Sequence, residues 1–251
     1  ASDLDVWLVS LSEHPRQEKP GIAILGGLEG NDPAATELCL SFVEFAASKA
    51  RSDEHIRAVL NRFTFYIFPS VHPDATARLW QKPSIADTLN ARPLDLDSDG
   101  QVSEDDVDDL NKDGWVTHMR ISDPAGAWAA DSLFPQLLRK VDPAKSQFGQ
   151  YRILSEGLDN DGDGLWNEDP RGGVTFDQNF SYEYAPFQTG SGPFPVSEIE
   201  TRAVADFLFS HANIALVFSF SHADTLLSPW QISKVGKIER GTPLDGVLPH
   251  D

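Results

Sequence analysis

The sequence predicts an α/β fold of three layers, with helices on both faces of a mostly parallel mixed sheet. Residues 21–28, 63–73 and 214–220 are apolar runs of the kind that form strands inside such a sheet. Residues 33–50 and 197–210 lie between these runs and carry apolar side chains at helical spacing. This alternation of strand and helix along one chain is typical of a single α/β domain.

Local signals mark the start of each helix. The first helix is expected to begin at Pro33, behind a cap formed by Asn31 or Asp32. The second begins at Ser197, and Glu200 three residues later gives this start the pattern of a capping box. These signals support the two helix predictions independently of the apolar spacing.

We expect one domain over residues 1–251, because a chain of this length fits one large α/β domain better than two. An Asp-rich insertion at about residues 90–170 interrupts it after the second strand. This insertion contains three acidic loops with the spacing of calcium-binding loops.

The first of these loops, DLDSDGQVSEDD at residues 95–106, follows the calcium-coordination motif closely. Alternate residues of a tightly wound loop bring their oxygens to one centre, and Gly100 makes the sharp turn at position 6. The candidate calcium ligands of this loop are Asp95, Asp97, Asp99, Gln101, Ser103 and Asp106.

The second loop begins at Asp109 and the third at Asp159. Arg120 stands at position 12 of the second loop, so this loop must borrow a carboxylate or bind calcium weakly. For all three loops the alternative is a solvated acidic segment without metal. The candidate ligands are Asp109, Asn111, Asp113 and Trp115 in the second loop, and Asp159, Asp161, Asp163, Leu165 and Asn167 in the third.

The amino-acid composition limits the classes of binding partner and indicates the cellular compartment. Twenty Lys and Arg against thirty-nine Asp and Glu give a net charge of −19, which argues against nucleic acid or an anionic membrane as the partner. The only cysteine, Cys39, lies in an apolar run and is expected to be buried. No apolar run is long enough for a membrane span. With the calcium loops, these features predict an exported protein, secreted or periplasmic.

Six motifs occur in the order found in the zinc carboxypeptidase family related to carboxypeptidase A, and the chain resembles that family over about residues 21–230. They are GGLEGND, PSVHPDATARLW, the pair Met119 and Arg120, FDQNF, SEIET and FSFSHADTLLSPW. The resemblance implies a carboxypeptidase-like fold, a zinc cofactor, peptide hydrolysis and a peptide or protein ligand. It also implies that Arg120 stabilises the oxyanion, although an ion pair with the Asp loops is an equal alternative. The inserted calcium loops resemble a bacterial subgroup of the family, which implies the bacterial envelope as the location.

The family's metal-binding positions are substituted. Glu29 stands where the family has its ligand His, and Asp32 stands where it has its ligand Glu. An ungapped alignment places Phe220 at the third ligand position, and a two-residue shift brings His222 there instead. A site of Glu29, Asp32 and His222 would favour calcium, magnesium or manganese over zinc, because it is rich in hard oxygen ligands.

The substrate-binding positions are substituted as well. In FDQNF, Asp177 and Gln178 replace the Asn and Arg that bind the substrate's C-terminal carboxylate, and neither offers a charged bidentate fork. His72 and Ala75 replace the Asn and Gly of the family's NPDG turn. These four changes weaken the expectation of ordinary carboxypeptidase specificity.

Two hypotheses follow from this pattern. The first is an exported metallopeptidase in which Glu29, Asp32 and His222 hold the catalytic metal. The second, which we favour, is a carboxypeptidase-like protein with a degenerate zinc site, weakly active or inactive, that retains the groove and the calcium loops for binding peptides. The chain ends at Asp251, before the strand that carries the family's general-base Glu, so either the chain is a fragment or the base is absent. A calcium-dependent adhesion or scaffold module is a third possibility.

Overall fold

A computed structural model describes residues 4–95, 100–162, 164, 166–167, 172–182 and 184–221. Its main sheet has four strands in the order β1-β3-β2-β10. The strands β2, β3 and β10 run parallel, and β1 pairs antiparallel with β3. The strands of this sheet are β1 (Val9–Leu11), β2 (Gly21–Leu25), β3 (Thr64–Phe68) and β10 (Ile214–Ser219).

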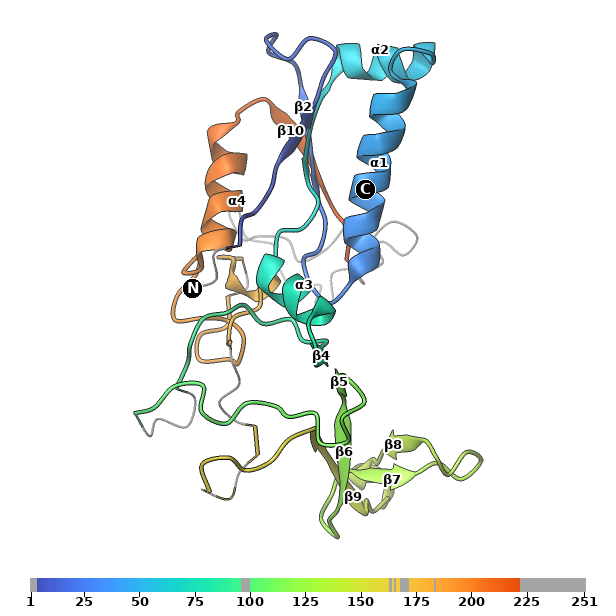
Figure 1. The fold of residues 1–251 in the computed structure, drawn as a ribbon, viewed down its shortest axis with the longest axis vertical. Coiled ribbons are helices and arrows are strands. Elements are labelled where there is room, and N and C mark those ends of the chain that lie inside the picture. Colours follow the sequence, from blue (N-terminus) through green and yellow to red (C-terminus); the bar gives the residue numbers. More distant parts are fainter. Residues whose placement is uncertain are drawn as a thin grey trace, which may run out of the picture.

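Helices cover both faces of this sheet, which confirms the α/β/α prediction. Figure 1 shows α4 on one side of the strands and α1 and α2 on the other. The helix α3 lies below the sheet in the same view, close to the first strands of the insertion. The helices are α1 (Pro33–Lys49), α2 (Glu54–Arg62), α3 (Pro73–Trp80) and α4 (Ile199–Ser210).

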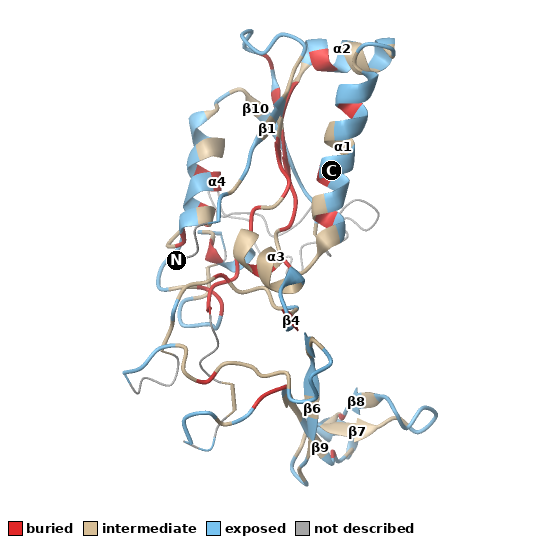
Figure 2. Cartoon of the chain, viewed as in Figure 1, coloured by how far each residue is buried: buried red, intermediate tan, exposed pale blue. Residues whose placement is uncertain are grey.

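The core is divided between the two faces because successive strand residues point in opposite directions. On one face, Ile24 of β2 packs in a cluster with Cys39 of α1 and Leu60 of α2. On the other, Leu25 packs in a cluster with Val204 of α4. Figure 2 shows the buried positions along the central strands and the inward sides of the helices. The expected burial of Cys39 is confirmed, and this burial raises the pKa of its thiol to about 11.

The strand β10 is less protected than its apolar sequence suggests. Among the described residues it pairs with β2 alone. Leu216, Val217 and Phe218 consequently keep 46%, 46% and 42% of their surface exposed.

The insertion forms an antiparallel sheet of its own, which the sequence did not predict. Its strands follow the order β6-β9-β7-β8, and a short parallel pair, β4 and β5, lies between it and α3. These strands are β4 (Ser84–Ile85), β5 (Trp115–Val116), β6 (His118–Ser122), β7 (Trp128–Ala130), β8 (Leu138–Lys140) and β9 (Tyr151–Ser155). The described residues also include two single-turn 3-10 helices, η1 (Pro143–Lys145) and η2 (Asp177–Asn179).

The capping box expected at Ser197 does not form, and α4 begins two residues later, at Ile199. Its N-cap residue, Glu198, makes no side-chain capping hydrogen bond. The Ser197 hydroxyl donates to Glu198 Oε1 at 2.6 Å, and Glu200 Oε1 accepts a hydrogen bond from Asn90 at 2.8 Å. Ser197 Oγ also accepts from Asn179 Nδ2 at 2.9 Å, so both side chains are engaged by distant residues in place of the local capping pattern.

Among the described residues, no helix is long and apolar enough to cross a membrane.

Candidate functional site

The predicted metal-binding residues lie at the edge of the sheet where the parallel strands β2, β3 and β10 end. In sheets of this type, ligands bind outside the carboxyl ends of the strands. The loop after β2 and the loop after β3 are joined there, since Val71 N–H donates to the Gly26 carbonyl at 3.0 Å. Phe220 N–H donates to the Leu25 carbonyl at 2.9 Å and brings in the end of β10.

Gly30 fixes the turn that carries Glu29 and Asp32 against α3. Its φ is +70°, a left-handed conformation that favours glycine, and a Cβ atom there would lie 2.3 Å from the Cβ of Ala75. The Thr76 hydroxyl also donates to the Gly30 carbonyl at 3.2 Å. The turn geometry therefore depends on a small residue at position 30 because Ala75 fills the adjoining space.

Both predicted carboxylate ligands are half-buried in this turn. Asp32 Oδ1 accepts a hydrogen bond from Ala34 N–H at 3.0 Å and thereby caps α1, as the sequence predicted. The third candidate, His222, lies outside the described residues. In the part of the chain that the structure describes, no three His, Cys, Asp or Glu side chains are grouped so that they could hold a metal ion.

An imidazole does lie beside this turn, but it belongs to His72. Its side chain is fully buried, with the ring centroid 6.3 Å from that of Phe176. The Leu28 backbone is near, yet neither ring nitrogen makes a hydrogen bond of acceptable distance and angle with a described residue. Burial lowers the pKa of His72 from 6.5 to about 4, an effect that Asp74 opposes and Arg78 reinforces.

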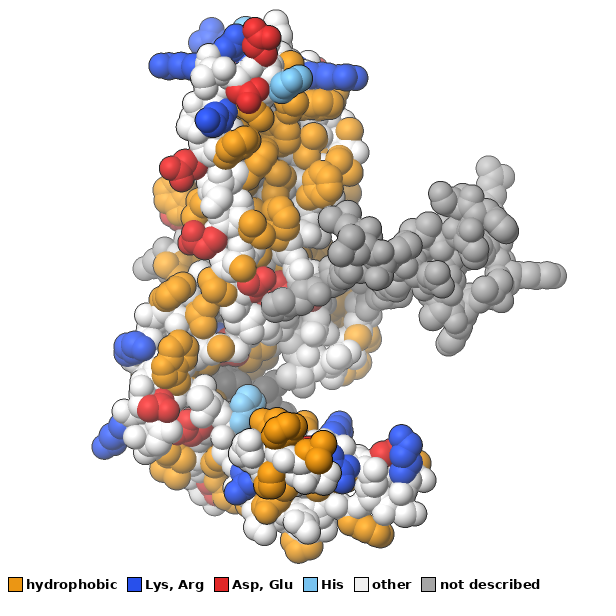
Figure 3. All heavy atoms as spheres, turned by 90° about the vertical axis from the view of Figure 1, so that its right-hand side faces the viewer, with side chains coloured by type: hydrophobic (Ala, Val, Ile, Leu, Met, Phe, Trp, Pro, Cys, Tyr) orange, Lys and Arg blue, Asp and Glu red, His pale blue; other side chains and the backbone are white. Residues whose placement is uncertain are grey.

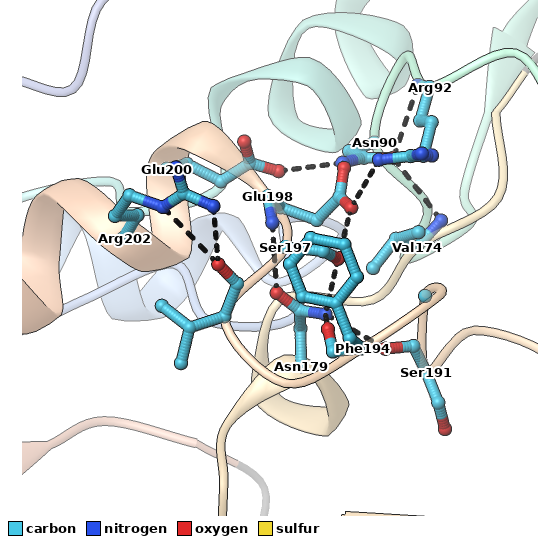
Figure 4. Close-up of polar contacts among 12 residues, drawn as sticks. Asn90, Arg92, Val174, Asn179, Ser191, Phe194, Ser197, Glu198, Glu200 and Arg202 are labelled. Carbon is cyan, nitrogen blue, oxygen red and sulfur yellow. Dashed lines mark hydrogen bonds and ion pairs between the residues drawn. The ribbon is translucent and has the colours of Figure 1, made fainter. Parts of the chain in front are cut away.

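A buried polar network joins the insertion to the start of α4 (Figure 4). At its centre, Asn90 donates from Nδ2 to Glu198 Oε2 and Glu200 Oε1, both at 2.8 Å, and accepts from Val174 N–H at 3.2 Å. Arg92 forms an ion pair of 2.9 Å with Glu198 Oε1. Every polar group of the Asn90 side chain is thus engaged in bonds between distant segments, which fixes their relative positions.

This network lines a pocket of about 420 Å³ between the starts of α3 and α4. Asp5, Asp74, Arg92, Glu198 and Glu200 supply its charged groups, and Leu4 and Val6 contribute apolar surface. Burial raises the pKa of the Glu200 carboxyl group, and the nearby carboxylates of Glu198 and Asp74 raise it further. The pocket therefore carries more negative than positive charge.

The FDQNF segment forms η2 and presents two different surfaces. Asp177 and Gln178, the predicted substrate-binding residues, are both exposed. Asn179 is fully buried, accepts from Glu198 N–H at 3.1 Å, and donates from Nδ2 to the Ser191 carbonyl at 2.8 Å. The segment therefore places its first two polar side chains at the surface and uses the third to hold the start of α4.

Arg120 lies on β6 of the insertion sheet and is exposed. Its guanidinium carbon sits 4.6 Å from the centre of the Tyr151 ring on the neighbouring strand β9. Figure 1 shows this sheet beyond α3 from the carboxyl ends of β2 and β3. The role of Arg120 in stabilising an oxyanion stays a prediction.

The three Asp-rich loops share one hydrogen bond and one glycine conformation among their described residues. In each, the first Asp accepts a hydrogen bond from the N–H of the glycine at position 6: Asp95 from Gly100 at 3.1 Å, Asp109 from Gly114 at 2.8 Å, and Asp159 from Gly164 at 3.0 Å. The three glycines have φ values of +97°, +87° and +95°, as the sharp turn requires. The candidate ligands Asp97, Asp99, Asp163 and Leu165 lie outside the described residues.

Two buried carboxylates support the second and third loops, and no sequence pattern distinguishes them from the neighbouring acids. Glu156 is 5% exposed and Asp105 is fully buried. Both occur within a long series of acids, and only their hydrogen bonds to distant loop backbones distinguish them. A lone acidic residue in an acidic segment is usually solvated, so this role could not be read from the local pattern.

The N-terminal part of the chain is similar in sequence to known proteins of one family. Residues 1–100 match the family model described as zinc carboxypeptidase. Carboxypeptidase D of Rattus norvegicus is 32% identical over 99 residues, and that of Homo sapiens is 32% identical over the same length. The aligned segment is 38% of this chain and 7% of either relative, so the chain spans a small part of their length.

The solved structure of thrombin activatable fibrinolysis inhibitor aligns with 85% of this chain and 38% of that chain, at 17% identity and a TM-score of 0.45. The sequence match over residues 1–100 includes both β2 and β3 with the turns that follow them. The candidate site at Glu29, Asp32 and His72 therefore lies within the zinc carboxypeptidase-like part of the chain.

Proposed function

We propose that this protein is a carboxypeptidase-like peptide-binding protein with a degenerate zinc site, weakly active or inactive as a hydrolase, and that its three Asp-rich loops bind calcium. The observation that carries the proposal is the donor set at the carboxyl ends of β2 and β3. There the family's ligand positions are occupied by Glu29 and Asp32, and Asp32 caps α1.

These residues fit zinc poorly. Catalytic zinc sites usually present three protein ligands that include one or more imidazoles and leave one position open. Glu29 and Asp32 provide oxygens only, and the imidazole beside them, His72, has no exposed surface through which a substrate could approach. We derive no catalytic step through zinc from this arrangement.

The peptide-binding part of the proposal rests on the resemblance to the zinc carboxypeptidase family. Exposed Asp177 and Gln178 stand in for the charged clamp, so a bound peptide would gain little from a free C-terminal carboxylate. We expect amidation of a peptide's C-terminus to change its affinity less than tenfold. A greater loss of affinity would show that a carboxylate clamp is present after all.

The calcium proposal is supported by two buried side-chain oxygen atoms. Asp95 Oδ1 and Asn167 Oδ1 are buried and make no hydrogen bond with a described residue. They belong to positions 1 and 9 of the first and third loops, where the motif places calcium ligands. Asp95, Asp109 and Asp159, with the other candidate ligands of their loops, would hold the ion. Calcium would then neutralise part of the acidic charge and join segments that otherwise repel. Calcium binding of this kind also supports export to the periplasm or the cell exterior, because extracellular modules bind calcium at millimolar concentrations.

A metal assay with a restored variant tests the central claim. Wild-type protein dialysed against zinc should retain no stoichiometric zinc and should not hydrolyse peptides with C-terminal basic or apolar residues. The double substitution E29H and D32E restores the family's ligand types and should raise zinc affinity. The alternative, an active metallopeptidase that uses Glu29, Asp32 and His222 with Arg120, predicts stoichiometric zinc in the wild type and hydrolysis that Glu29→Ala abolishes. That result would overturn the proposal.

A further inference from the structure

The second and third Asp-rich loops are each closed by a buried carboxylate that comes from outside the loop. In a complete calcium loop of this type, an acid at position 12 closes the structure. The second loop has Arg120 at this position and the third has Pro170. In both loops position 12 therefore lacks an acid, although Glu168 and Asp169 occupy positions 10 and 11 of the third.

Glu156 closes the second loop. Its Oε1 accepts from the N–H groups of Leu110 and Asn111, at positions 2 and 3, at 2.9 and 3.2 Å. Its Oε2 accepts from the N–H and hydroxyl of Thr117, at position 9, at 3.1 and 3.0 Å. These four bonds use the full accepting capacity of a carboxylate, and the hydrogen bonds from Thr117 lower the pKa of Glu156.

Asp105 closes the third loop in the same way. Its Oδ1 accepts from Asn160 N–H, at position 2, at 2.9 Å, and its Oδ2 accepts from Asn167 N–H, at position 9, at 2.5 Å. Both closing residues therefore join positions 2 and 9 of a loop to which they do not belong. Asp105 is next to the last residue of the first loop, and Glu156 lies just before the third.

We propose that Asp105 and Glu156 are positioning residues that replace the missing position-12 acids and couple the three loops into one cooperative calcium-binding unit. Asp105 belongs to the first loop and binds the backbone of the third loop. Glu156 belongs to the segment that leads into the third loop and binds the backbone of the second loop. A further contact reinforces this path, since Asn160 Nδ2 donates to the Asp106 carbonyl and to Asp108 Oδ2, both at 3.2 Å. This inference rests on the proposed calcium binding.

Two tryptophans allow the loops to be observed separately. Trp115 lies in the second loop and Trp166 in the third, so terbium bound in place of calcium can be excited through each. In the Trp115→Phe protein, terbium emission reports the third loop. In the Trp166→Phe protein, it reports the second loop.

Asp105→Asn should weaken terbium binding to the third loop at least tenfold, although residue 105 belongs to the first loop. The reason is that the new amide nitrogen is a donor that must face the N–H of Asn160 or Asn167. Glu156→Gln should weaken the second loop by a similar factor. The matched control is Asp131→Asn in the same insertion, because Asp131 accepts from the N–H groups of Leu133 and Phe134 but bonds to none of the three loops.

The outcomes separate the two proposals. If wild-type protein binds neither calcium nor terbium at millimolar concentration, calcium binding is refuted and the coupling with it. If the wild type binds but Asp105→Asn and Glu156→Gln behave like Asp131→Asn, calcium binding stands and the coupling is refuted.

Amide hydrogen exchange on the wild type tests the coupling between the loops even if a variant fails to fold. The N–H groups of Asn111, Thr117, Asn160 and Asn167 should gain protection at one calcium midpoint with a Hill coefficient above one. Separate midpoints for the second and third loops would overturn the coupling.

Discussion

At the scale of single residues, the site is defined by side chains whose environment differs from what their sequence position suggests. His72, which the resemblance to zinc carboxypeptidases places at a polar turn position, is fully buried. Asp32, which the same resemblance places at a metal-ligand position, caps a helix. Each residue therefore has a structural contribution that can be measured separately from any role in binding.

His72 should make the protein sensitive to acid. The pKa of the folded-state imidazole is lowered to about 4, whereas an unfolded chain binds this proton below about 6.5. Between these values the unfolded state holds more protons, so stability falls as the pH decreases from about 6.5 to 4. The full shift corresponds to about 3 kcal/mol.

Urea unfolding of the wild type and His72→Gln at several pH values between 7 and 4 would measure this contribution. The loss of stability should be smaller in His72→Gln, whereas the control His55→Gln, at an exposed position of α2, should retain the wild-type loss. Parallel pH profiles for wild type and His72→Gln would contradict the prediction.

At the scale of elements, substitutions at the start of α1 can distinguish a helix-capping role of Asp32 from a metal-binding role. Asp32→Ala removes the side-chain acceptor for Ala34 N–H and should destabilise the protein by about 1 kcal/mol. Asp32→Asn keeps a capping oxygen and should retain most of the stability. Chemical denaturation without added metal measures both effects. Equal loss in the two variants would show that the negative charge, and not the cap, is what matters.

Among the described residues, β10 is an edge strand with exposed apolar side chains. Its sequence, IALVFS, has no charge or proline, and an exposed uncharged edge strand can pair with another chain. Figure 3 shows further apolar side chains on the face over α1, where Leu38 and Phe45 are 55% and 50% exposed. This part of the molecule should therefore set its solubility limit.

Val217→Lys should reduce concentration-dependent light scattering, because a charge on an edge strand opposes pairing. The matched control is Val59→Lys on α2, since Val59 is 41% exposed and Val217 is 46% exposed. Unchanged scattering in Val217→Lys, or an equal improvement in Val59→Lys, would show that the edge is not responsible.

At the scale of the whole molecule, the sequence predicted the layers of the fold because apolar runs and helical apolar spacing indicate buried strands and helices wherever they occur in a chain. The runs at β2, β3 and β10 and the spacing in α1 and α4 each identified their element. The insertion sheet was missed because its strands are not long apolar runs: β7 and β8 have three residues each, and β6 (HMRIS) and β9 (YRILS) contain polar and charged residues.

The candidate site was only partly accessible to sequence reasoning. Residue types at Glu29 and Asp32 predict an altered donor set, which stays a prediction, and spacing identifies the three acidic loops. The buried state of His72 and the cross-loop bonds of Asp105 and Glu156 depend on chain segments far apart in sequence, so no local pattern contains them.

The last prediction concerns the stability of the whole molecule. A net charge of −19 disfavours the compact state, and calcium in the Asp-rich loops would both reduce the repulsion and bind the folded state selectively. At a calcium concentration about 100 times the dissociation constant, one site adds about 2.7 kcal/mol. For a protein of this size, each kcal/mol raises the Tm by roughly 2–4 °C. Removing calcium with a chelator should therefore lower the Tm by several degrees. Sodium chloride at matched ionic strength should restore only the part due to general screening, and full restoration by salt alone would mean that the loops do not bind calcium specifically.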